Sequence, residues 1–173
     1  MSTMRRKDRE VKERDEILAI VNRGRICHLA MCADGEPYVI PMLYGYADDC
    51  LYFHCAEVGK KLDILRKNNR VCFEITNSPE TIIENMGQPC DWGIPFESVI
   101  GFGNVELIET DGDAKKAAYD VLVTKLAPPG YTHTNGNYEE KKIKGTFIIK
   151  VRIESMTGKR WDGTKMPPAK PHA

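Results

Sequence analysis

The residues Gly59, Lys60 and Lys61 follow an apolar run, residues 51–55, and lie where a helix is expected to begin. At a helix start the backbone N–H groups lack partners and the helix dipole is positive, so an anion is stabilised there. Two lysine ammonium groups add positive charge at the same point. The pattern therefore indicates a phosphate-binding corner, although a solvated first turn with two exposed lysines has the same sequence.

His54 is the candidate catalytic residue, and it belongs to the same apolar run. Alternation along a strand puts Tyr52 and His54 on one face and Leu51 and Phe53 on the other, so one face meets the core and the other a ligand. An imidazole that titrates near neutral pH could donate a hydrogen bond or a proton to a bound substrate. The alternative is a hydrogen-bonded histidine without a catalytic role.

Cysteines suggest metal binding at first, but their spacing argues against it. There are six: Cys27, Cys32, Cys50, Cys55, Cys72 and Cys90. Two pairs have Cys-x4-Cys spacing, and residues five apart on a strand point to opposite faces. We therefore predict reduced, mostly buried thiols and no metal site.

Composition excludes several classes of protein. The chain has 173 residues, which suits one domain, and its 25 basic residues equal its 25 acidic ones, so we expect no nucleic-acid partner. No segment approaches the roughly 20 apolar residues of a membrane span. The basic residues near the N-terminus are not followed by the apolar core of a signal peptide, so we expect a cytoplasmic protein without a membrane partner.

Hydrophobic patterning predicts the elements that would position these residues. Six strands are expected at residues 25–32, 38–46, 51–54, 71–75, 98–108 and 146–153, with a hairpin at Asp34-Gly35. Helices are expected at residues 7–22, 60–68 and 111–126. Residues 76–96 and 127–144 are predicted to be surface segments, and residues 157–173 a polar tail.

Strands joined mainly by hairpins favour an antiparallel sheet, so the predicted class is mainly β (α+β), a small six-stranded antiparallel barrel flanked by helices. Pro41 has no N–H group and must lie at a sheet edge or bulge. The backbone groups of Ile40 and Met42 are then free for another partner. Glycines at 101 and 103, inside a predicted strand, indicate a bulge, a barrel corner or a close approach.

Several blocks occur together in one order: residues 4–7, 36–42, 51–56, 59–61, 98–103 and 156–159. In this arrangement the chain resembles the flavin-binding split barrels related to pyridoxamine 5′-phosphate oxidase, and among them the nitroimidazole-resistance (Nim) type. The resemblance implies a split β-barrel domain over residues 1–160, followed by a partly disordered polar tail over residues 161–173.

The resemblance also implies FMN at the interface of a homodimer. The phosphate would lie near Gly59, Lys60 and Lys61, and the flavin ring near the backbone of Ile40, Pro41 and Met42. Phe53 and His54 would lie beside the flavin. Contacts from Ser98, Val99 and Ile100 could come from the other subunit.

Two departures from the B6 oxidases argue against oxidation of pyridoxamine phosphate. Ile40 stands where those enzymes carry a basic residue, and their C-terminal substrate-binding pattern is missing. The expected function is an FMN-dependent oxidoreductase that reduces small acceptors such as nitroaromatics with electrons from NAD(P)H or another donor. The alternatives are a non-enzymatic FMN-binding electron carrier or flavin reservoir, or a relative that binds haem or a deazaflavin.

Overall fold

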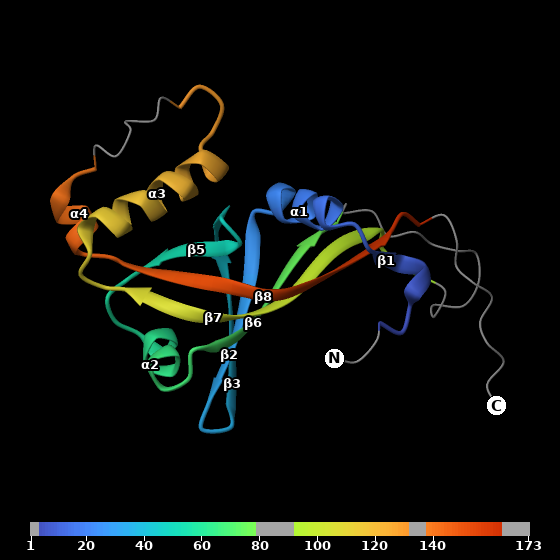
Figure 1. Ribbon diagram of the computed structural model, residues 1–173, viewed down its shortest axis with the longest axis horizontal. Coiled ribbons are helices and arrows are strands. Elements are labelled where there is room, and N and C mark those ends of the chain that lie inside the picture. Colours follow the sequence, from blue (N-terminus) through green and yellow to red (C-terminus); the bar gives the residue numbers. More distant parts are fainter. Residues whose placement is uncertain (1–3, 79–91, 132–137, 164–173) are drawn as a thin grey trace.

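The computed structural model describes residues 4–78, 92–131 and 138–163. Its strands are β1 Glu10–Val11, β2 Ile26–Ala33, β3 Glu36–Leu43, β4 Gly45–Ala47, β5 Cys50–Cys55, β6 Arg70–Asn77, β7 Phe96–Ile108 and β8 Phe147–Trp161. Its helices are α1 Arg14–Arg23, α2 Lys60–Lys67, α3 Gly112–Leu126 and α4 Glu140–Lys144, with a 3-10 helix η1 at Lys7–Arg9. Every strand pair is antiparallel, which confirms the predicted α+β class (Figure 1).

The sheet curls into a barrel that stays open along one seam. Seven strands follow the order β3-β2-β6-β7-β8-β5-β4, and β1 pairs with β8 outside this path. The strands at the two ends of the path, β3 and β4, are consecutive in the chain, with only Tyr44 between them. The sheet must therefore bend until its ends meet, although no ladder joins β3 to β4 among the described strands. The predicted antiparallel split barrel is confirmed, but the predicted number of six strands is wrong, because the described residues alone form a sheet of eight.

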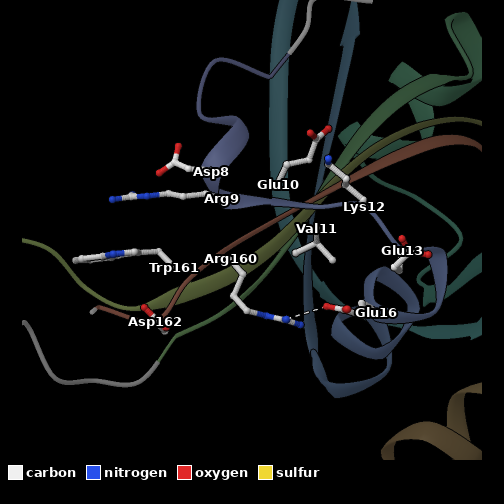
Figure 2. A pocket seen from close by; sticks show the side chains of 10 residues that line it. All are labelled: Asp8, Arg9, Glu10, Val11, Lys12, Glu13, Glu16, Arg160, Trp161 and Asp162. Atoms are coloured by element: carbon white, nitrogen blue, oxygen red, sulfur yellow. Dashed lines mark hydrogen bonds and ion pairs between the residues drawn. The ribbon is translucent and has the colours of Figure 1, made fainter. Parts of the chain in front are cut away.

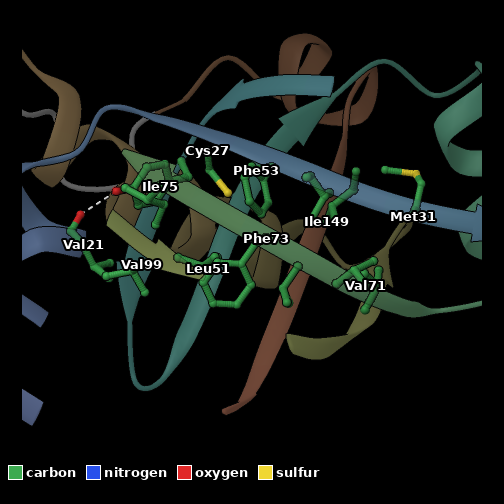
Figure 3. Close-up of a cluster of buried hydrophobic side chains, with 14 of the residues drawn as sticks. Val21, Cys27, Met31, Leu51, Phe53, Val71, Phe73, Ile75, Val99 and Ile149 are labelled. Carbon is green, nitrogen blue, oxygen red and sulfur yellow. Dashed lines mark hydrogen bonds between the residues drawn. The ribbon is translucent and has the colours of Figure 1, made fainter. Parts of the chain in front are cut away.

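Alternate side chains of the long strands fill the barrel. In β6, Val71, Phe73 and Ile75 are buried and the residues between them are partly exposed, because successive strand residues point to opposite faces. Figure 3 shows them meeting side chains from β2, β5, β7, β8 and α1. The Tyr44 hydroxyl donates to the backbone carbonyl of Val21, which fastens the seam to α1.

Helices cover the outside and one end of the barrel. The first helix, α1, packs on β6, β7 and β8, α2 on β2, and α3 on β4 and β5. Asp111 caps α3 by accepting a 3.0 Å hydrogen bond from the Ala114 amide. The Lys67 ammonium lies 2.6 Å from Asp34 and ties the end of α2 to the β2–β3 hairpin. Within the described residues, no helix has the length and apolar character that a membrane span requires.

The predicted hairpin at Asp34-Gly35 is confirmed, and a second turn of the same kind joins β4 to β5. Asp34 and Gly35 join β2 to β3 with φ values of 54° and 82°, and Asp48 and Asp49 join β4 to β5 with φ values of 50° and 55°. Two successive residues with positive φ match the twist of an antiparallel pair. These turns fix the register of both hairpins.

The predicted helix at residues 7–22 is wrong over its first half. Residues 10 and 11 instead pair with Lys159 and Gly158 of β8, and the α-helix begins only at Arg14. Val11 can approach because Gly158 has no side chain: a Cβ there would lie 2.9 Å from the Val11 Cβ. Burial of Val11 against β8 therefore overrides the helix propensity of the local sequence.

The predicted start of the polar tail, residue 157, lies within the last strand, β8. Residues 157–161 continue β8, because β7 pairs with them as far as Phe96 opposite Trp161. Trp161 is only 8% exposed. Part of the segment predicted as a surface excursion, residues 140–144, is the helix α4. The remaining tail, residues 164–173, and most of the segment predicted at 76–96, including Cys90, lie outside the described residues, as do residues 132–137.

Candidate functional site

The start of α2 presents free backbone donors. Gly59 precedes the helix with φ of 135°, and its carbonyl accepts from the amides of Leu62 at 2.9 Å and Asp63 at 3.3 Å. No side chain caps this end, and the amides of Lys60 and Lys61 have no acceptor among the described residues. A Cβ built on Gly59 would have no atom within 4 Å, so the space in front of the helix is open.

The two lysines at this helix start are not neutralised. Neither Lys60 nor Lys61 forms an ion pair within the part of the chain that the structure describes. The Lys60 ammonium lies 5.0 Å from the centre of the Tyr38 ring, and Lys61 is close enough to Cys55 to offset part of the rise that burial causes in the pKa of that thiol. Free amides, a helix dipole and two unpaired cations together fit a phosphate group.

The Tyr38 contact brings β3 to this corner. Tyr38, Ile40 and Met42 are the partly buried residues of β3 and share one face, while Pro41 is exposed on the other. β3 ends the path of the sheet, so the predicted edge position of Pro41 is confirmed. Its free edge and the start of α2 together border a corner that could hold a phosphate and a planar ring beside it.

Two of the predicted contact residues have no accessible side chain. Phe53 and Val99 are 0% exposed and belong to the barrel core. The predicted alternation along β5 is confirmed, because Phe53 is buried and His54 is exposed. A cofactor could reach Phe53 or Val99 only through backbone groups, and that contact stays a prediction.

Ser98 and Ile100 lie far from His54 within one chain. His54 pairs with Ile148 near the start of β8, whereas Ile100 pairs with Thr157 near its end. The nine residues from 148 to 157 correspond to about 30 Å of strand. The structure therefore does not bring Ser98 and Ile100 into one site with the β5 end of the same chain.

His54 instead meets aromatic residues that the sequence did not single out. Its ring centre lies 5.9 Å from that of Tyr119 in α3, and Tyr119 lies 5.5 Å from Tyr138. The sequence placed Tyr119 on a predicted helix and Tyr138 in a predicted surface segment. No local pattern marks either residue, because only the packing of α3 on β5 brings them together.

A second hollow, of about 610 Å³, lies beside the N-terminal segment (Figure 2). The Arg9 guanidinium lies 4.7 Å from the centre of the Trp161 ring, and Arg160 donates to Glu16 at 2.9 Å. Arg9 Nε and Trp161 Nε1 are buried without an acceptor among the described residues. Trp161 is therefore a buried packing residue that also lines this hollow. This hollow is lined by β1, α1 and the end of β8 rather than by the start of α2.

An open antiparallel barrel with flanking helices defines a split-barrel protein, and the uncapped, lysine-bearing helix start at its edge could hold a phosphate group. The chain belongs to the pyridoxamine 5′-phosphate oxidase family, whose sequence profile matches residues 13–160.

Among known proteins, an uncharacterized protein of Rhizobium meliloti (strain 1021) is 35% identical over 66 residues, which are 38% of this chain and 42% of that relative. The matched part thus spans less than half of the curated relative.

Solved structures resemble this one over most of its length. One is a proposed 5-nitroimidazole antibiotic resistance protein from Bacteroides thetaiotaomicron, with a TM-score of 0.71, 27% identity and coverage of 87% of this chain and 85% of that one. The flavocytochrome Anf3 from Azotobacter vinelandii has a TM-score of 0.79 at 20% identity, covering 96% and 76%. An FAD- and heme-binding protein from Mycobacterium smegmatis has a TM-score of 0.76 at 18% identity, covering 92% and 76%. The last two establish a shared fold alone.

Proposed function

We propose that this protein is an FMN-dependent oxidoreductase that reduces small acceptors such as nitroaromatics with electrons from NAD(P)H or another donor. The observation that carries the proposal is the start of α2, where Lys60 and Lys61 combine unpaired ammonium groups with free amides. FMN ends in a monophosphate, which suits such a corner. The likeness to the proposed nitroimidazole resistance protein, at 27% identity, supports the acceptor class.

The protein would act as a homodimer with the flavin at the subunit interface. Support comes from the separation of Ser98 and Ile100 from His54 in their own chain, because a second copy could bring them to a flavin beside His54. A surface suited to pairing exists on the outside of the barrel. Its exposed apolar residues form what we term the outer apolar face: Ile26, Val39, Leu43, Ile100 and Phe102.

Register explains why these residues form one surface. Ile26 of β2 pairs with Leu43 of β3. In a second row across the sheet, Val39 of β3 pairs with Ala30 of β2, Ala30 with Cys72 of β6, and Cys72 with Phe102 of β7. Paired residues of neighbouring strands project to the same side of a sheet. Exposed large apolar residues that gather on one side of a sheet are typical of an interaction surface.

Each residue group has a separate role in the proposed reaction. Lys60, Lys61 and the nearby amides hold the phosphate, the β3 edge orients the ring, and His54 donates a hydrogen bond or a proton to the acceptor. The bound flavin supplies hydride and electron transfer. The barrel supplies a rigid frame for these groups.

Anaerobic titration tests the proposal directly. Purified protein with bound FMN is mixed with NADH or NADPH, with and without metronidazole, while flavin absorbance is followed. We expect bleaching by the nicotinamide and reoxidation by the nitroimidazole. Flavin that stays oxidised with either nicotinamide contradicts the NAD(P)H-driven reaction, flavin that is reduced but not reoxidised by the acceptor favours an electron carrier, and a haem Soret band favours the haem-binding alternative.

A further inference from the structure

A cavity of about 820 Å³ lies between the end of β5 and the helices α3 and α4. Small-molecule sites commonly have volumes of about 300 to 1,000 Å³. His54 reaches it from β5, Tyr119 from α3, and Tyr138 from the residues just before α4. The candidate catalytic residue is therefore part of a cavity that is large enough for an organic substrate.

The aromatic wall of this cavity has fixed ring positions. The Tyr119 hydroxyl shares a 2.8 Å hydrogen bond with the hydroxyl of Thr146, and the Tyr138 hydroxyl donates to Asp120 at 2.7 Å. Burial, and then this bond to Asp120, raise the pKa of Tyr138, so its hydroxyl stays protonated. Because both hydroxyls are engaged, the rings are held in place, and a planar ligand could pack against them at little further cost in side-chain entropy.

The charge at the cavity mouth is positive. Glu139 neutralises Lys142 at 3.1 Å, whereas Lys141 has no ion-pair partner among the described residues. Asp120, whose carboxylate accepts from the Tyr138 hydroxyl, does not line the cavity, so the lining residues carry more lysines than carboxylates. Aromatic walls can also attract cations, but an unpaired lysine at the mouth repels them.

From this geometry we infer that the cavity binds the acceptor, and that the acceptor is a planar aromatic compound with a negatively charged substituent. The ring packs against Tyr119 and Tyr138, the anionic group faces Lys141, and His54 contacts the ring from the β5 side. The inference rests on the proposed reductase function for the ligand's role as acceptor. Binding by itself does not depend on turnover.

Calorimetric titration of 4-nitrobenzoate into the full-length protein as purified, without any electron donor, measures that binding. Nitrobenzene serves as the neutral counterpart. Tyr119→Leu should lower the affinity for both ligands by about three- to tenfold, because an aromatic contact is lost. Lys141→Ala should weaken 4-nitrobenzoate by about two- to fivefold and leave nitrobenzene unchanged.

Three variants separate binding from folding. Tyr119→Phe keeps the ring and should keep wild-type affinity. Tyr131→Leu and Lys116→Ala remove an exposed tyrosine and an α3 lysine that do not line the cavity, so they should bind both ligands normally. Equal 4-nitrobenzoate affinity in the wild type, Tyr119→Leu and Lys141→Ala, or no binding at all, would overturn the inference.

The two proposals fail independently. If the flavin is never reduced but 4-nitrobenzoate binds with the expected pattern of variants, the cavity inference holds and the reductase function fails. If nitroaromatics are reduced with the same KM in Tyr119→Leu, Lys141→Ala and the wild type, the reductase function holds and the cavity inference fails.

Discussion

Lys60 and Lys61 carry the strongest functional expectation at the scale of single residues. Their side chains are unpaired within the described residues, and the amides beside them are free. A phosphate bound there would gain charge-assisted hydrogen bonds, which contribute about 1.5–3 kcal/mol each. The corner should therefore distinguish FMN from riboflavin, which has no phosphate.

The double change Lys60→Ala with Lys61→Ala is expected to weaken FMN binding by roughly a hundredfold or more, because the phosphate loses both cations. Quenching of flavin fluorescence measures the affinity. Riboflavin affinity should hardly change. Lys67→Ala, at the other end of the same helix, controls for charge, and equal FMN affinity in all three proteins would refute the phosphate site.

Gly101 shows the close approach that a glycine inside a strand predicts. A Cβ at this position would lie 2.2 Å from Cζ of the buried Phe73 and 2.7 Å from the backbone oxygen of Ser155. Gly101→Ala should therefore lower the free energy of unfolding by about 1–3 kcal/mol. Thermal unfolding should show a melting temperature lower by about 2–4 °C per kcal/mol.

Gly112 is the matched control for this prediction. It lies at the start of α3, and no atom is within 4 Å of a Cβ built there. Gly112→Ala should be neutral or slightly stabilising, since alanine favours a helix. Equal melting temperatures for Gly101→Ala and the wild type would contradict the crowding around Gly101.

At the scale of elements, Glu97 joins four of them. Its carboxylate accepts from Arg23 of α1 at 2.8 and 2.7 Å and from Asn77 of β6 at 3.1 Å, and Arg160 of β8 lies 3.5 Å away. The hydrogen bonds from Arg23, and then that from Asn77, hold the pKa of Glu97 below its ordinary value of 4.5. The group therefore stabilises the fold above about pH 4.5, and this contribution is lost as pH falls through the folded-state pKa.

Glu97→Gln is expected to lower the free energy of unfolding at pH 7 by about 1 kcal/mol, since Arg23 is half exposed and solvent screens part of the interaction. Urea unfolding at pH 7 and pH 3.5 checks this. The difference from the wild type should shrink at pH 3.5, because the carboxyl is already largely protonated in the unfolded state below pH 4.5. Glu106→Gln, which removes a surface ion pair with Lys150, should change the free energy of unfolding little. A difference between Glu97→Gln and the wild type that is larger at pH 3.5 than at pH 7 would contradict the proposed effect of Glu97 ionisation on stability.

At the scale of the whole molecule, the outer apolar face is the candidate dimer surface. Ile100→Glu is expected to shift the mass in light scattering from twice the chain mass of 19.6 kDa to the single chain mass, because a carboxylate would be desolvated at the interface. Ile100 is 45% exposed, so the fold should tolerate the change. FMN affinity should fall in parallel, since Ser98 and Ile100 would serve the partner's flavin.

Tyr131→Glu controls for this prediction, since Tyr131 is exposed but follows α3 in the chain and is not one of the strand residues of the outer apolar face. It should leave mass and FMN affinity unchanged. A monomeric wild-type protein that still binds FMN tightly would contradict an interfacial flavin. A dimer that persists in Ile100→Glu would show that the outer apolar face is not the dimer interface.

Much of the barrel could be predicted because its signals are local. Asp34-Gly35 fixes a hairpin, Asp111 caps a helix, and alternating apolar residues mark the long strands. The predicted elements were wrong where pairing with another strand determined the secondary structure. Glu10 and Val11 form a strand because they pair with β8. Residues 157–161 form a strand because they pair with β7.

The sequence by itself determined the helix start that we propose as the phosphate site, since Gly59, Lys60 and Lys61 follow a strand and open a helix. Tertiary structure decided what surrounds it. Only the curled sheet brings Tyr38 to Lys60 and separates Ile100 from His54, and only helix packing gathers Tyr119 and Tyr138 around His54. The physical reason is the sequence separation of the residues involved. A helix start or a turn depends on residues that are neighbours in the sequence, whereas a cavity depends on side chains that are far apart in the sequence and meet only in the folded chain.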